Sequence, residues 1–121
     1  MKCTKCACKG GYLEKFIQPT ILKILFNEPR HGFYILSKLS ESSVVDGNAP
    51  DPTGMYRMLK KMEAEGLLKS EWDKNNYSQP RRVYSITDEG RECLKEWSVT
   101  LDSYSKKINA LSKEISELFK E

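Results

Sequence analysis

The chain has 121 residues, of which 39% are hydrophobic and 31% are charged, and its formal net charge is +3. This composition allows one small hydrophobic core. It argues against a membrane-spanning protein, because no apolar run approaches the roughly 18 residues that a membrane helix needs. The N-terminus lacks the apolar stretch of a secretion signal, so we expect a cytoplasmic protein. Residues 1–87 carry a net charge of +5 and residues 88–121 carry −2, which concentrates the positive charge in the first part.

Three cysteines near the N-terminus, Cys3, Cys6 and Cys8, form a C-x-x-C-x-C cluster, and Cys93 stands far away in the sequence. Thiolates at such spacing select zinc or another thiophilic metal, and Cys93 would complete a tetrahedral site. The alternative is an unliganded segment whose thiols stay reduced. We therefore expect a separate N-terminal segment over residues 1–12, with a metal or redox role left open.

Two scaffold helices are expected next, followed by a loop rich in Ser, Gly, Asn and Pro over residues 42–50. The first helix ends at Asn27-Glu28-Pro29, and the second covers about residues 32–40. Their predicted core residues are Ile17, Ile21, Ile24, Leu25, Ile35, Leu36 and Leu39. His31, the only histidine, precedes the second helix, where a capping or packing role is favoured over metal binding, catalysis or a proton switch.

A helix with two distinct faces is predicted from Asp51 to Gly66. Asp51 and Pro52 form a start signal, and Gly66 is a typical helix end. One face is apolar and consists of Met55, Met58, Leu59 and Met62. The other face consists of Thr53, Tyr56, Arg57, Lys60 and Lys61. A cationic face of this size suits a DNA phosphate backbone, although solvated surface charges are the plainer alternative.

Two antiparallel strands follow this helix, because alternation replaces the helical period after Gly66. Leu68, Ser70 and Trp72 are expected on the half-buried face of the first strand, and Arg82, Tyr84 and Ile86 on that of the second. The polar segment 73–80 lies between them. A hairpin that carries Lys74, Arg81 and Arg82 is suited to the DNA backbone or the minor groove.

The C-terminal segment carries an uninterrupted heptad pattern, with apolar residues at alternating steps of three and four. These residues are Leu94, Trp97, Leu101, Tyr104, Ile108, Leu111, Ile115 and Leu118. A helix from Asp88 to about Lys120 would be roughly 50 Å long, longer than a small domain is wide. We therefore expect a coiled-coil homodimer in which this seam is the interface. A helix folded back over its own domain is the alternative, but no Gly or Pro follows Gly90 to break it.

Three sequence blocks together resemble the PadR family of transcriptional regulators. They are HGFYI at residues 31–35, MYRMLKKMEAEGLL at 55–68 and RVYSITDEG at 82–90. The resemblance covers about residues 16–101 and implies a winged helix-turn-helix domain, operator DNA as the partner and a repressor role. In multidrug-sensing members, a tryptophan early in the last helix stacks flat aromatic ligands at the dimer interface. Trp97 occupies the matching place, with a purely packing role as the alternative.

Taken together, the sequence predicts a mainly α protein (α+β) with a two-stranded wing. Its parts would be the segment 1–12, a winged DNA-binding domain over 13–87 and a dimerisation helix over 88–121. The predicted function is a homodimeric, effector-modulated regulator that binds a two-fold related operator in double-stranded DNA. The alternative is a protein-interaction adaptor that does not bind DNA. An enzyme is not expected, because no nucleophile with its base, phosphate-binding loop or catalytic metal motif is present.

Overall fold

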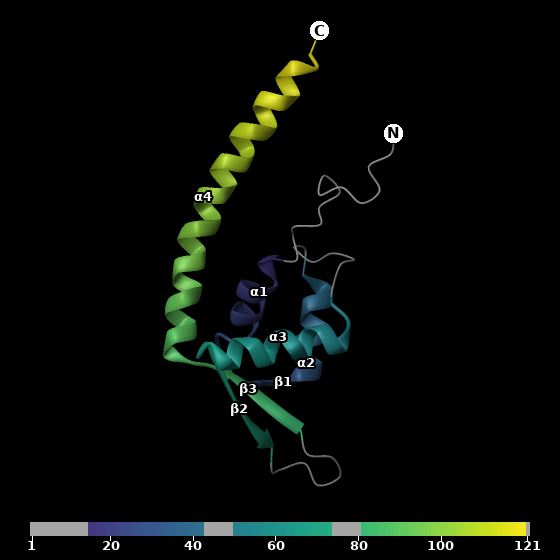
Figure 1. Ribbon diagram of the computed structural model, residues 1–121, viewed down its shortest axis with the longest axis vertical. Coiled ribbons are helices and arrows are strands. Elements are labelled where there is room, and N and C mark those ends of the chain that lie inside the picture. The colour runs from purple at the N-terminus through teal and green to yellow at the C-terminus, as the bar shows by residue number, and fades with distance from the viewer. Residues whose placement is uncertain (1–14, 43–49, 74–80, 121) are drawn as a thin grey trace.

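The computed structural model describes residues 15–42, 50–73 and 81–120. Within these ranges the chain forms four helices and three strands. Their order is α1 (Ile17–Ile24), β1 (Arg30–His31), α2 (Gly32–Glu41), α3 (Pro52–Ala64), β2 (Leu68–Asp73), β3 (Arg81–Ile86) and α4 (Asp88–Leu118). This arrangement confirms the predicted fold class, a mainly helical winged helix-turn-helix with a long C-terminal helix (Figure 1).

The core lies between the first three helices and one face of the sheet. Its buried hydrophobic residues are Ile17, Ile21, Leu22, Leu25, Ile35, Leu39, Met55, Leu59, Met62, Leu68, Tyr84 and Ile86. Ile24, Leu36 and Met58 pack at its edge and are only partly buried. The helical period therefore identified the correct faces, although it missed Leu22, which is fully buried.

Helix α3 begins and ends at the residues that the sequence predicts. The Asp51 side chain accepts a hydrogen bond of 2.8 Å from the Gly54 backbone N–H, and Pro52 occupies the first turn. Gly66, just beyond the helix, has a φ of +83°, a conformation that glycine adopts without the steric penalty of a side chain. These local signals fix the direction in which the chain leaves α3 and enters β2.

The wing is part of a three-stranded antiparallel sheet in the order β1-β3-β2. The two predicted strands are present and pair from Leu68↔Ile86 to Asp73↔Arg81. The third strand, β1, was not predicted, because a two-residue strand is too short to show any alternation. It pairs with the middle of β3, with Arg30 opposite Tyr84 and His31 opposite Val83.

Helix α4 starts directly against the turn between α3 and β2. The Thr87 side chain caps it by accepting from the Gly90 N–H at 3.0 Å and donates to the Gly66 carbonyl oxygen at 2.6 Å. A β-carbon at Gly90 would overlap the carbonyl oxygen of Leu67, so this close approach requires glycine. From there α4 runs for 31 residues and extends well beyond the rest of the fold (Figure 1). None of the helices in the described ranges has the length and apolar character needed to cross a bilayer.

Candidate nucleic-acid interface

Helix α3 presents its predicted polar face to solvent. Thr53, Tyr56, Arg57, Lys60 and Lys61 are all exposed, whereas the residues at the core-facing positions of the same helix are buried. Arg57, Lys60 and Lys61 form no ion pair with any residue in the described parts of the chain. Their charge is therefore available to an external anion.

Tyr56 lies over the start of α2 and connects α3 with that helix. A β-carbon at Gly32 would come within 2.5 Å of the Tyr56 hydroxyl oxygen and ring, so the tyrosine ring occupies space that only a glycine leaves open. About half of Tyr56 remains exposed. This contact places the phenol at the edge of the groove described next.

A groove of about 530 Å³ lies between Tyr56 of α3, the start of α2 and the start of β3 in the wing. Its lining residues are His31, Gly32, Phe33, Tyr56, Arg81 and Arg82. Both arginines are exposed at the start of β3. The groove thus brings cations of the wing next to the exposed face of α3. Lys74, the remaining predicted wing cation, lies outside the described residues.

Arg82 is held by contacts with its own sheet. Its Nε donates a hydrogen bond of 3.0 Å to the Ser70 Oγ, and its guanidinium carbon lies 5.0 Å from the centre of the Trp72 ring. The Ser70 hydroxyl in turn donates to the Glu63 carboxylate, whose oxygens are 2.9 and 3.0 Å away. Glu63, Ser70 and Trp72 were not among the predicted site residues. The strand register, which places Trp72 opposite Arg82, reveals the two strand residues, and the packing of α3 on β2 brings in Glu63.

Trp72 corrects one detail of the predicted alternation. It was expected on the half-buried face, but 56% of the residue is exposed. Leu68, which lies four residues earlier on the same face of β2, is buried. The wing runs away from the helices toward its tip (Figure 1), so the face that is covered at Leu68 is open at Trp72.

His31 is the N-cap residue of α2, but its side chain makes no capping hydrogen bond, so the packing alternative of the predicted role is the one that the structure shows. Its Nε2 lies 3.0 Å from the Asp73 Oδ2 instead, and both side chains are partly buried. This contact crosses the sheet from β1 to β2 on the face that also carries Val83. His31 therefore ties the two outer strands together.

Tyr84 is buried on β3, and its surroundings raise its pKa. Burial is the main cause, the nearby Arg82 lowers the pKa, and Tyr56 and Glu63 raise it further. The phenol consequently stays neutral at ordinary pH and contributes packing to the base of the wing.

Helix α4 divides the predicted seam into two parts. Leu94 and Trp97 are partly buried against the chain's own core, and Leu101 lines a groove beside α1. The later seam residues, Tyr104, Ile108, Leu111, Ile115 and Leu118, are exposed. The expectation that the whole seam is free of its own domain is therefore wrong for its first part, because α4 packs on α1 before it extends into solvent.

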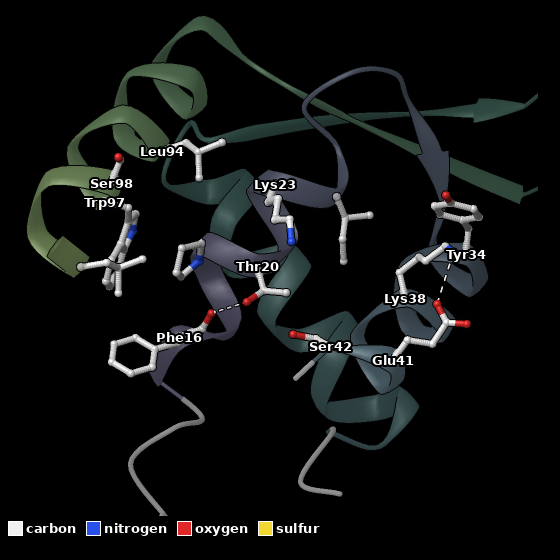
Figure 2. A pocket seen from close by; sticks show the side chains of 13 residues that line it. Phe16, Thr20, Lys23, Tyr34, Lys38, Glu41, Ser42, Leu94, Trp97 and Ser98 are labelled. Atoms are coloured by element: carbon white, nitrogen blue, oxygen red, sulfur yellow. Dashed lines mark hydrogen bonds and ion pairs between the residues drawn. The ribbon is translucent and has the colours of Figure 1, made fainter. Parts of the chain in front are cut away.

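Trp97 forms one wall of a groove of about 760 Å³ that passes over α1 between α4 and α2 (Figure 2). Its Nε1 donates to the Gln18 Oε1 at 3.1 Å, and its ring meets the Phe16 ring edge-on with centres 6.3 Å apart. Leu94 and Leu101 also line this side, and Lys23 rises from α1 in the middle of the groove. The lining is thus aromatic and aliphatic, with isolated polar groups.

The cysteine prediction can be followed only at Cys93, because Cys3, Cys6 and Cys8 lie outside the described residues. Cys93 is a partly buried free thiol. Burial first, and then the carboxylates of Glu96 and Glu65, raise its pKa. No group of three or more potential metal ligands occurs within the described ranges. A metal-binding role thus remains a prediction.

Residues 21–96 match the family described as the transcriptional regulator PadR-like family. The chain belongs to this family. The matched segment contains α2, α3 and the sheet, so the PadR-like core includes the whole groove between α3 and the wing. The family consists of transcriptional regulators and not of enzymes, which confirms the expectation that this PadR-like chain is no enzyme.

Several solved structures resemble the PadR-like chain. A PadR family transcriptional regulator from Eggerthella lenta DSM 2243 is 26% identical with a TM-score of 0.74, and the match covers 87% of this chain and 88% of that one. TA0346 from Thermoplasma acidophilum is 32% identical with a TM-score of 0.72, covering 85% and 96%. Bacillus subtilis PadR, solved in complex with operator DNA, is 22% identical with a TM-score of 0.60, covering 69% and 46%, and shares the fold. A comparison with curated proteins found no match.

Proposed function

We propose that the protein binds operator DNA as a homodimer and regulates transcription, acting as a repressor that an effector modulates. The observation that carries this proposal is the exposure of two groups of cations: Arg57, Lys60 and Lys61 on α3, and Arg81 and Arg82 at the groove that Tyr56 of α3 also lines. A duplex seated on this surface would place α3 in the major groove and a phosphate backbone along the wing. The complex of Bacillus subtilis PadR with operator DNA supports the proposal. Such a regulator acts in the cytoplasm, where bacterial and archaeal DNA is found.

The residues of α3 take different roles in this proposal. Thr53 lies in the first turn of α3, so it is assigned to base edges together with Tyr56. Arg57 and Lys60 contact phosphates, with Lys61 at the margin. Lys74, Arg81 and Arg82 hold the wing to the backbone.

Two copies are proposed to pair along the exposed part of the α4 seam. Five seam residues between Tyr104 and Leu118 are exposed although their heptad spacing is that of a coiled coil. Burying a stripe of this kind against a second copy removes apolar surface from water and stabilises the pair. Pairing also sets two copies of α3 at a fixed separation, as a two-fold related operator requires.

The effector is proposed to be a small planar aromatic molecule bound at Trp97. The indole and the Phe16 ring offer apolar surface within a groove large enough for such a ligand. Titration with a flat aromatic dye should quench the Trp97 fluorescence, and Trp97→Ala should abolish dye binding. If the dye binds equally well to Trp97→Ala, the effector does not stack on this residue.

The DNA proposal is tested by fluorescence anisotropy with a duplex from the region upstream of the gene, over a series of salt concentrations. We expect affinity to fall steeply with salt, because phosphate contacts release counterions. The double variant Arg57→Ala, Lys60→Ala should bind more weakly and with a smaller salt slope. A matched control is Lys106→Ala, which removes a cation from α4 that already pairs with Asp102. Affinity that is independent of salt or unchanged in the double variant would favour the adaptor function.

A further inference from the structure

The hydrogen-bonded chain from Glu63 through Ser70 to Arg82 connects α3 with both strands of the wing. Glu63 lies in the last turn of α3, Ser70 on β2 and Arg82 on β3. The Ser70 hydroxyl has one hydrogen to donate, which goes to Glu63, and its lone pairs accept from the Arg82 Nε. Glu63 and Arg82 form no direct ion pair, so within the described residues the hydroxyl is their link.

This arrangement engages the Nε of Arg82 and leaves its two terminal nitrogens available for an external ligand. Nε is engaged by Ser70, and the guanidinium plane is supported by the Trp72 ring at 5.0 Å, within the range of a cation–π contact. The terminal nitrogens donate to none of the described residues. These nitrogens carry the hydrogens with which a guanidinium grips a phosphate, and Arg82 lines the groove next to α3.

We infer that Glu63, Ser70 and Trp72 are positioning residues that hold Arg82 as a preorganised phosphate clamp between the recognition helix and the wing. The inference rests on the proposed DNA-binding function and specifies how one cation of that surface is used. Since Ser70 and Trp72 already restrain the Arg82 side chain, and Glu63 holds Ser70, Arg82 loses little conformational freedom when a phosphate binds. The cation is thereby set at a fixed distance from α3, which positions the duplex backbone relative to the base-reading helix.

The test compares two substitutions of Ser70 that have nearly the same shape. Ser70→Thr keeps the hydroxyl, whereas Ser70→Val replaces it with a methyl group. We expect Ser70→Thr to bind duplex DNA like the unmodified protein. Ser70→Val should bind DNA roughly two- to tenfold more weakly for each protein copy whose Arg82 contacts the duplex. This is the factor expected when one long side chain must become ordered during binding. Ser85→Val, the same exchange on the opposite face of β3, should leave affinity unchanged.

A double-mutant cycle with Arg82→Ala then separates positioning from a general structural role. If Ser70 acts through Arg82, Ser70→Val should have no further effect once Arg82 is alanine, and the same should hold for Trp72→Ala. An equal loss in both backgrounds, or no loss in the unmodified background, would overturn the inference. Because phosphates are common to all sequences, the loss should be the same on the upstream duplex and on an unrelated duplex of equal length.

The same measurements distinguish this inference from the proposed function. Salt-dependent DNA binding by the unmodified protein with additive effects of Ser70→Val and Arg82→Ala would overturn the clamp alone. Absence of salt-dependent binding by the unmodified protein would overturn the proposed function and the clamp together. Thermal melting of each variant shows whether a loss of affinity follows from unfolding, and Ser70→Thr provides the folded, hydroxyl-bearing reference.

Discussion

Replacing Leu111 with alanine tests whether α4 pairs through its exposed seam. Leu111 lies in the middle of the free part of the heptad pattern, and 58% of the residue is exposed in the single chain. Complete burial of a leucine side chain is worth about 1.5 to 3 kcal/mol, so covering the exposed fraction contributes roughly 0.9 to 1.7 kcal/mol. Each copy loses this amount, and the dimer therefore loses roughly 2 to 3.5 kcal/mol, a weakening of about 20- to 400-fold in its dissociation constant.

Val99→Ala is the matched control, because Val99 is also on α4 and even more exposed, at 72%, but stands outside the heptad positions. Sedimentation velocity over a range of protein concentrations gives the dissociation constant of each variant. The Leu111→Ala dimer should dissociate at a much higher protein concentration than the unmodified dimer. The Val99→Ala dimer should have the same dissociation constant as the unmodified protein. The proposed pairing would be refuted if both substitutions raised the dissociation constant equally, or if the unmodified chain stayed monomeric at micromolar concentration.

Three further substitutions test separate features. Gly90→Ala should lower the melting temperature, since its methyl group would overlap the carbonyl oxygen of Leu67 and force α4 away from the turn before β2; circular dichroism measures this. Because the pKa of Cys93 is raised in the folded state, the folded protein keeps the thiol proton to a higher pH than the unfolded chain does. The free energy of unfolding should therefore fall as pH rises from the ordinary cysteine pKa toward the raised one. Urea unfolding at increasing pH, with Cys93→Ala as reference, checks this sign, and a pH dependence that is identical in both would contradict it. Anaerobically purified protein should contain a thiophilic metal that Cys6→Ser loses if the N-terminal cluster binds one; metal analysis without any metal would remove that hypothesis.

The parts of the fold that follow from the sequence are those encoded by local signals. Asp51 and Pro52 start α3, and Gly66 ends it, because a capping carboxylate, a fixed φ and a left-handed residue act within a few positions of the chain. The heptad spacing likewise predicts α4, since a periodic apolar stripe needs no knowledge of its neighbours. The exposed face of α3 follows from the same helical period.

The contacts that build the groove depend on segments far apart in the sequence. Strand β1 has only two residues and is defined by pairing with β3, more than 50 positions later. The link between Ser70 and Arg82 requires the hairpin register, which the long polar segment between the strands does not specify. The alternation placed Trp72 on the correct face of β2, but it cannot tell where the covering helices end.

The start of α4 is joined to the turn after α3 tightly enough to transmit a change at the proposed dimer seam. The Thr87 N–H donates to the Leu67 carbonyl oxygen at 3.1 Å, and the Thr87 hydroxyl bonds both Gly66 and Gly90. Three hydrogen bonds and the missing side chain of Gly90 thus make the turn after α3 and the first turn of α4 one unit. Between Gly90 and Leu111 the helix is roughly 30 Å long, so a change of about 5° in the crossing angle of two paired helices, shared equally between them, would displace each Gly90 by about 1.3 Å. A displacement of that size lies within the helix shifts of about 1 to 2 Å that switch other regulated assemblies. A ligand at Trp97, on the stretch of α4 between this unit and the free seam, would therefore bind where a small tilt has a large effect on the spacing of the recognition helices.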